Sequence, residues 1–152
     1  MEINGNLLPA KLINLIENDL WELPEEKIYL DAIYPRLKNL ELYGLGLMKI
    51  ETEGLINHCH PTSELPELSN FFLGKADEQF PPGNIDLMKA ILIGDLGLGS
   101  DTPIALDYRE DKNNPSVLIL HYFRLNNKTN TRWLKIANTF EEFWETIGTK
   151  YS

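Results

Sequence analysis

The stretch AILIGDLGLGSDTPIALDYR, residues 90–109, decides the fold because it places two apolar segments on either side of a glycine-rich turn. Ala90–Ile93 is a short apolar run of the kind that forms a buried strand. Gly94–Asp101 holds three glycines and two aspartates, which predicts a tight turn. In Pro103–Arg109 the large apolar residues alternate with others, so a second strand with one face buried is expected there.

Two further strands are expected to follow this pair. Glu110–Pro115 is polar and predicts a turn, whereas Val117–Phe123 is apolar on both faces, which predicts a strand near the centre of a sheet. A second polar turn is expected at Leu125–Thr131 and a fourth strand at Trp133–Ala137. Three consecutive strands joined by short turns form an antiparallel meander.

The C-terminal segment predicts an amphipathic helix that packs on this sheet. Thr139 and Glu142 have the spacing of a capping box, in which each residue satisfies a free amide at the helix start. Gly148 supplies the C-terminal stop. The apolar stripe of the helix consists of Phe140, Phe143, Trp144 and Ile147.

The N-terminal part predicts two shorter helices. One is expected near Pro9–Leu20, where leucine and isoleucine recur at helical spacing. A second is expected to begin at Pro24 and to stop at Pro35.

The middle of the chain is less regular. Residues 38–56 contain glycines that argue against a long helix, so one or two strands are expected there. His58–Asn84 predicts mostly loop, with a short turn of helix near Leu65–Phe72. The whole pattern predicts a single α+β domain over residues 1–152, with a mixed or antiparallel sheet, N-terminal helices and a C-terminal helix packed on it.

The net charge of −9 is concentrated in the middle third of the chain, since residues 51–101 carry nine acids and two bases. Such a protein lacks the basic surface on which nucleic-acid binding depends, so a direct DNA or RNA role is disfavoured. A basic protein partner would instead be attracted to it. An acidic surface that only keeps the protein in solution is the alternative.

Location is predicted from what the chain lacks. Cys59 is its one cysteine, so no intrachain disulfide can form, which fits a reducing compartment. The first residues do not form a signal peptide, and the apolar runs are far shorter than the roughly 20 residues that cross a bilayer. We therefore expect a cytoplasmic protein that does not bind a membrane.

The glycine turn at Gly94–Asp101 invites comparison with a phosphate-binding loop, because glycine amides can hold an anion. A strand rather than a helix is expected to follow it, however, and no lysine is near. Asp95 and Asp101 would also repel a phosphate. An ordinary turn is the better interpretation.

His58, Cys59 and His60, with Glu64 nearby, suggest a metal site or a nucleophilic thiol. Adjacent residues point in divergent directions, which does not suit the four ligands of a structural zinc site. A catalytic cysteine would need a histidine placed by the fold and a positive local field. The remaining histidine, His121, is expected to be a structural residue on the central strand.

Asp95, Asp101 and Asp107 are the candidate catalytic or cation-binding carboxylates. Asp101 could equally hydrogen-bond the backbone of its own turn. Asp107 and Arg109 lie on the same face of a strand, where an ion pair is expected. We therefore predict no catalytic residue, no metal site and no cofactor.

Four segments, in this order, resemble the SUKH superfamily, which groups bacterial immunity proteins with a yeast regulator of cell-wall synthesis. They are the strand and glycine turn at Ile91–Gly99, the ALDYR strand at Ala105–Arg109, the WxxIA strand at Trp133–Ala137 and the FxxFW helix at Phe140–Trp144. The resemblance covers about the last 60 residues. It implies a mixed sheet with helices packed on it and no enzymatic activity.

Membership would further imply an immunity protein that neutralises a cognate toxin, frequently a nuclease, by direct binding. We expect a basic partner, and a chain that is a monomer or a weak homodimer. The expected contact residues lie in the acidic middle third: Glu51, Glu53, Glu64, Glu67, Asp77 and Glu78. A general interaction module without a toxin, like the eukaryotic relatives, is the first alternative, and a small hydrolase with a carboxylate or thiol centre is the second.

Overall fold

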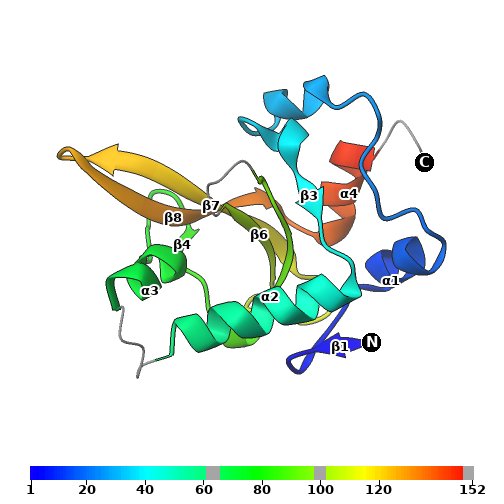
Figure 1. The fold of residues 1–152 in the computed structure, drawn as a ribbon, viewed down its shortest axis with the longest axis horizontal. Helices are drawn as coiled ribbons and strands as arrows, with labels where there is room; N and C mark the ends of the chain where they lie inside the picture. The colour runs from blue at the N-terminus through cyan, green and yellow to red at the C-terminus, as the bar shows by residue number, and fades with distance from the viewer. Residues whose placement is uncertain (61–65, 98–101, 149–152) are drawn as a thin grey trace.

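In the computed structural model, which describes residues 1–60, 66–97 and 102–148, one antiparallel sheet is flanked by helices (Figure 1). The order of strands in the sheet is β3-β5-β6-β7-β8-β4. A separate hairpin near the N-terminus pairs β1 (Glu2–Ile3) with β2 (Asn6–Leu7). This architecture confirms the α+β fold predicted from the sequence.

The meander forms the centre of the sheet. Its strands are β5 (Ala90–Asp95), β6 (Pro103–Asp107), β7 (Ser116–Leu125) and β8 (Lys128–Ala137). The two outermost strands, β3 (Glu41–Leu42) and β4 (Pro82–Gly83), have two residues each. Because both edges are so short, most of the sheet's outer backbone must be covered by other elements.

Two details of the meander differ from the prediction. The second turn is only Asn126–Asn127, so β8 begins at Lys128 rather than at Trp133. Both asparagines have positive φ (53° and 62°), a conformation that asparagine tolerates and that lets two residues close a hairpin. The strand expected at Pro103–Arg109 is present as β6, but the prediction that only one of its faces is buried is wrong, because β6 is central and all five of its residues are buried.

One face of the sheet, here called the α1–α4 face, is covered by α1 (Ala10–Glu17) and α4 (Phe140–Gly148), both expected from the sequence. The Thr139 half of the predicted capping box is present in α4, where the Glu142 amide donates to Thr139 Oγ1 (3.1 Å). Glu142 Oε2 accepts from the amide of Asn138 (2.8 Å), one residue before the expected partner. The aromatic stripe of α4 packs into a core that also includes residues of α1 and of alternate positions on β5, β6 and β7: Leu12, Leu15, Ile91, Ile93, Ile104, Leu106, Val117 and Ile119.

The opposite face is here called the α2–α3 face. It is covered by the end of α2 (Leu45–His58), by α3 (Pro66–Leu73) and by the segment around η3 (Leu87–Lys89). The α3 helix confirms the turn of helix expected near Leu65–Phe72. The buried residues of this face are Leu55, Ile85, Leu87, Ala90, Leu92, Ala105, Leu118, Leu120 and Trp133.

The strands expected within residues 38–56 are mostly a helix, α2, preceded by the short β3. Two glycines inside α2 weaken it by about 1 kcal/mol each, but packing outweighs that cost. The buried stripe of α2 is Met48, Thr52 and Leu55, spaced by four and three residues. Because one member of so narrow a stripe is polar, the helical pattern was hidden in the sequence.

The second helix expected from Pro24 is reduced to short 3₁₀ segments. η1 spans Ile28–Ala32 and η2 spans Leu37–Asn39, with Pro35 between them. Leu30 and Leu37 are fully buried and join the core of the α1–α4 face. A short 3₁₀ turn suits this stretch because a proline cannot continue a helix.

Candidate functional site: an acidic pocket beside α2

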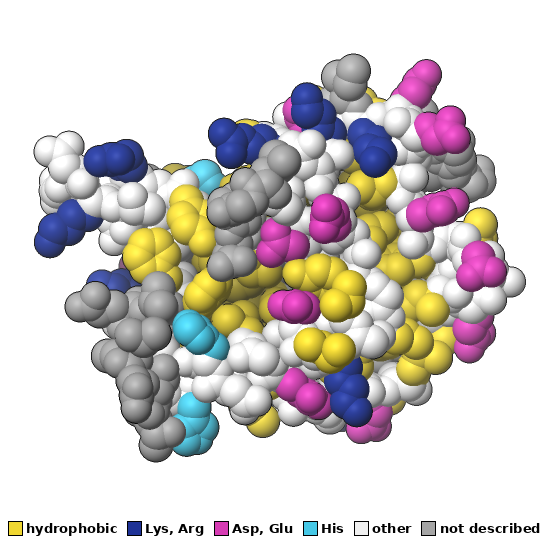
Figure 2. Space-filling view, in the orientation of Figure 1, with side chains coloured by type: hydrophobic (Ala, Val, Ile, Leu, Met, Phe, Trp, Pro, Cys, Tyr) yellow, Lys and Arg dark blue, Asp and Glu magenta, His cyan; other side chains and the backbone are white. Residues whose placement is uncertain are grey.

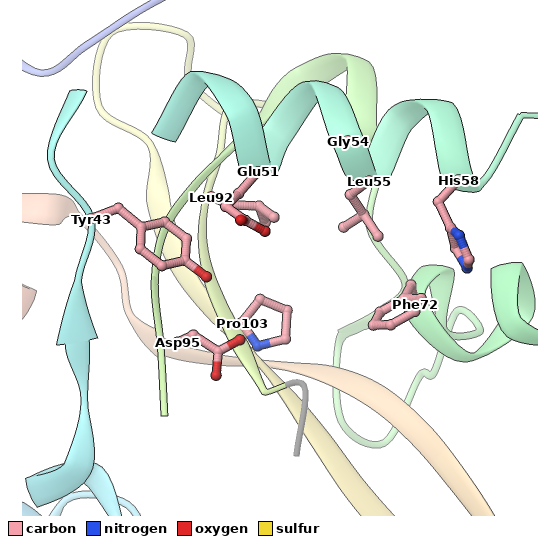
Figure 3. A pocket seen from close by; sticks show the side chains of 9 residues that line it. All are labelled: Tyr43, Glu51, Gly54, Leu55, His58, Phe72, Leu92, Asp95 and Pro103. Carbon is pink, nitrogen blue, oxygen red and sulfur yellow. The ribbon is translucent and has the colours of Figure 1, made fainter. Parts of the chain in front are cut away.

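A pocket of about 300 Å³ lies between α2, the edge of the sheet at β3 and β5, and α3 (Figure 3). In Figure 2 this side of the molecule is hollowed above α2, with apolar side chains in the hollow and carboxylates at its margin. The lining residues are Tyr43, Glu51, Gly54, Leu55, His58, Phe72, Leu92, Asp95 and Pro103.

The position of α2 along this edge depends on a hydrogen bond to the sheet backbone. β3 pairs only with Gly94 and Asp95, the last two residues of β5, so the Leu92 amide has no partner in β3. Thr52 Oγ1 accepts from this amide at 2.9 Å, and Thr52 is buried. The helix is therefore fixed at its middle, and the neighbouring Glu51 and nearby Leu55 are brought to the pocket.

Two carboxylates face the pocket from different elements. Figure 3 shows Glu51 extending from α2 and Asp95 extending from the end of β5 on two sides of the pocket, with Pro103 between them and Leu92 beside Glu51. No Lys or Arg is among the described residues that line the pocket. The site is therefore negatively charged over an apolar floor.

Asp95 is held in position by the turn that follows β5. Its Oδ1 accepts from the Gly97 amide at 2.8 Å, and Gly97 has φ of +68°, a conformation that suits glycine. The carboxylate thus completes its own turn, which agrees with the ordinary turn preferred over a phosphate loop for this segment. The rest of the segment, residues 98–101, lies outside the described part of the chain.

An aromatic ring stands at each end of the pocket. The backbone of Tyr43 is fixed by two hydrogen bonds, since its amide donates to Ile93 O (2.9 Å) and its carbonyl accepts from Trp21 Nε1 (2.8 Å). At the other end, the carbonyl of Phe72 accepts from Trp133 Nε1 at 2.8 Å. Both rings therefore project from a backbone that is held by hydrogen bonds.

The cysteine and histidines at the end of α2 join this helix to α3. The His58 ring meets the Phe72 ring edge-on at 5.6 Å, and the Ser69 hydroxyl donates to His58 O at 3.2 Å. Cys59 Sγ lies 3.9 Å from Ser69 O. Burial raises the pKa of the Cys59 thiol, which is the opposite of what an activated nucleophile needs.

The arrangement of ligand-type residues does not suggest a metal centre. Within the described residues, no group of three or more His, Cys, Asp or Glu side chains is placed to hold a metal ion. Glu64, considered with Cys59 in the sequence, lies outside the described part. His58 Nε2 is buried and has no hydrogen-bond partner among the described residues.

The candidate catalytic aspartates are kept apart by the sheet. Asp95 pairs with Pro103 at one end of the β5–β6 ladder and Asp107 pairs with Ala90 at the other, so they do not form a carboxylate pair. Asp107 makes the predicted ion pair with Arg109 at 3.0 Å. Arg109 also donates to Asn84 O at 2.7 Å, which gives it a structural role between β6 and the segment before β5. Asp101 lies outside the described residues.

His121 has the structural partners expected of it. Its Nδ1 lies 2.6 Å from the Tyr34 hydroxyl, and its ring stacks on Phe123. Burial and then the positive charge of Arg132 lower the pKa of His121, so the neutral ring is favoured. A second hollow of about 480 Å³ lies beside Tyr34 and His121, and Arg36 is in its lining.

The predicted contact residues fall in separate places. Glu51 lines the pocket, whereas Glu53 is exposed two positions further along α2, about 200° around the helix. Asp77 accepts from the Gln79 amide (2.9 Å) and pairs with Arg132 (3.4 Å). The pKa of Asp77 is lowered first by the hydrogen bond that its carboxylate accepts from the Phe80 amide (3.0 Å), and then by those from Gln79 and Arg132.

The other predicted contact residues add no further member to the pocket. Glu78 is exposed on the same loop as Asp77. Glu64 and the side chain of Glu67 lie outside what the structure describes. Of the predicted set, Glu51 is the member that the fold brings together with other site residues.

Sequence reasoning missed most of the pocket. Tyr43 was placed in an expected strand region and Phe72 at the end of a short turn of helix, and Asp95 was considered only for catalysis, cation binding or phosphate repulsion. The sequence did contain one usable pattern, the helical spacing of Met48, Thr52 and Leu55. A helix with these residues buried places Glu51 next to its buried stripe.

Comparison of the chain with family models, with curated proteins and with solved structures finds no match. Among the helices of the described residues, none combines the length and the apolar character needed to span a membrane.

Proposed function

We propose that this chain is a non-enzymatic protein-binding domain that neutralises a basic partner, a bacterial toxin such as a nuclease, by direct contact through the pocket beside α2. The observation that carries the proposal is that Glu51 and Asp95 line the same pocket beside apolar residues. Both lie on elements whose positions are fixed by hydrogen bonds. A site whose backbone is already fixed loses less conformational entropy on binding.

The charge of the chain favours a basic partner. The middle third, which supplies much of the pocket lining, carries nine acids and two bases. Complementary charge raises the rate at which two proteins associate and disfavours partners of like charge. A nuclease suits this surface because its substrate-binding region must be basic to hold phosphates.

The toxin itself is suggested by the resemblance to immunity proteins of the SUKH superfamily, which rests on four segments between Ile91 and Trp144. Those segments belong to the sheet and to α4, whereas α2 and α3 carry the proposed contact surface. Such a division allows one fold to serve different partners, since the binding side chains can change while the sheet is kept.

The proposal is tested by purifying the tagged protein from native lysate and identifying what is retained. We expect a basic protein that is toxic when expressed alone and harmless when expressed with this chain. The complex should weaken as salt is raised. Recovery of an acidic partner, or of a partner without toxicity, would contradict the immunity function.

A charge reversal locates the surface. Glu51→Lys should weaken the complex by about tenfold or more, because it places a cation opposite a basic partner. Glu145→Lys is the matched control, since Glu145 is an exposed acid on α4 and the change in net charge is identical. Equal effects of the two variants would mean that binding occurs elsewhere.

A further inference from the structure

We propose that the pocket beside α2 receives the side chain of one arginine from the partner, which acts as the anchor of the complex. This inference rests on the proposed function, because it names the group of the basic partner that the pocket recognises.

The size of the pocket suits one long side chain. At about 300 Å³ it is at the lower end of pockets that take small molecules. A helix or a strand of the partner would not enter it. A deeply seated side chain surrounded by weaker contacts is also how binding energy is usually distributed in protein interfaces, where arginine is one of the favoured anchors.

The lining matches the two parts of an arginine. Leu55, Leu92 and Pro103 offer apolar surface for the three methylenes of the stem. Glu51 and Asp95 face the pocket from two elements (Figure 3), so a guanidinium between them could donate to both. A planar group with five donors suits two acceptors in different directions better than an ammonium does.

The aromatic rings add a second preference for a guanidinium. Tyr43 and Phe72 line opposite ends of the pocket, and an arginine readily stacks on such rings. None of the described lining residues is a cation that would compete for them. The pocket therefore offers two carboxylates and two aromatic rings to an incoming group.

The chain uses the same combination internally. The guanidinium of Arg132 lies 4.2 Å from the centroid of the Phe80 ring and 4.2 Å from that of the Phe123 ring. Asp77 completes this arrangement with an ion pair at 3.4 Å. Two rings and a carboxylate thus hold an arginine of this protein, and the described lining of the pocket contains groups of the same kinds.

The inference is tested with a peptide, so that no partner is needed. The probe is the capped tripeptide Ac-Gly-Arg-Gly-NH₂, titrated into the isotopically labelled full chain while amide resonances are followed. The matched control replaces arginine with citrulline, which has the same shape and no charge. We expect saturable shifts at Tyr43, Glu51, Leu92 and Asp95 with the arginine peptide, and binding weaker by about tenfold with citrulline.

Two variants on one helix test the contact. Glu51→Gln should weaken binding of the arginine peptide by about tenfold, whereas Glu53→Gln, an equal change in charge on another side of α2, should alter it less than about twofold. Both residues are exposed, so both variants should keep the thermal stability of the parent. Tighter binding of the corresponding lysine peptide would overturn the preference for a guanidinium.

Failure of the anchor and failure of the proposed function give different results. If the arginine peptide shows no shifts at the pocket, or binds no better than the citrulline peptide, the anchor is wrong even where Glu51→Lys weakens a toxin complex. If the peptide binds as expected but native lysate yields no basic partner, the pocket recognises arginine and the immunity function is wrong.

Discussion

The two faces of the sheet are closed in different ways. On the α1–α4 face, Phe140 and Ile147 of α4 are almost completely buried against Leu12 of α1 and the strands. On the α2–α3 face, α2 runs along the edge of the sheet and α3 lies beside β8 (Figure 1). The cover is incomplete there, and a pocket lined by residues of α2, α3 and the sheet remains. One face is a filled core, and the other is a core with a binding site at its margin.

This difference separates stability from recognition within one sheet. Apolar burial stabilises by about 25 cal/mol per Å², and the α1–α4 face has the larger set of buried side chains among the described residues. The α2–α3 face instead brings charged and aromatic groups to its opening. Substitutions on the first face should therefore act mainly on folding, and those at the opening mainly on binding.

The largest expected effect is on the α1–α4 face. Phe140→Ala should lower the free energy of unfolding by about 3–5 kcal/mol, because it leaves a cavity in a filled core. Phe140 is 1% exposed and packs near Trp21 and Phe143. Denaturant unfolding followed by tryptophan fluorescence would measure the change.

The matched substitution on the other face is Leu55→Ala. Leu55 is 9% exposed and already borders the pocket, so its removal should cost only about 2 kcal/mol, at the low end for a buried leucine. If Leu55→Ala were as destabilising as Phe140→Ala, the two faces would not differ in the way proposed here.

The α1–α4 face was also the easier one to predict from the sequence. The apolar residues of β6, the apolar run in β5 and the capping residue Thr139 each act over a few residues, so local patterns located these elements, although the alternation in β6 wrongly predicted one exposed face. The long β8 was predicted too short, because the polar residues after Asn127 looked like a turn. Tertiary pairing with β7 outweighed that local preference.

The pocket was not predictable in the same way. Its lining extends from Tyr43 to Pro103 in the sequence, and the members meet only because α2 is fixed to the edge of β5. The hydrogen bond that fixes it joins a side chain to a backbone amide 40 residues away, a relation that no periodicity reveals. Glu51 was identified by its charge, without its partners in the site.

An intermediate effect is expected where α2 meets the sheet. Thr52→Val keeps the shape of the side chain but removes the acceptor of the Leu92 amide, and an unsatisfied buried amide costs about 1–3 kcal/mol. Urea unfolding of this variant would measure the loss. Binding of the arginine peptide should weaken as well, since Glu51 is adjacent to the lost contact.

Thr52→Ser is the control for this prediction, because serine retains the hydroxyl and lacks only the methyl group. It should preserve peptide binding while losing less stability than the valine variant. Were Thr52→Val to bind the peptide like the parent, the opening on the α2–α3 face would not depend on this hydrogen bond, and α2 would be fixed by packing alone.

The smallest expected effect is a pH dependence that belongs to the α1–α4 side of the sheet, where His121 lies on the same side of β7 as Val117 and Ile119. Burial first, and then Arg132, hold the pKa of His121 below its ordinary value of 6.5. The neutral ring is therefore stabilised by folding, and this contribution is fully present above that value and is lost as the pH falls through the folded pKa. Unfolding at about pH 7.5 and about pH 5.5 should show a loss of stability at the lower pH that is reduced in His121→Gln, which stays neutral at both.

The arginine peptide should bind the parent and this variant equally at about pH 7.5, since His121 is not among the residues that line the pocket. A variant that lost peptide binding at the higher pH would couple the two faces and remove the distinction between them.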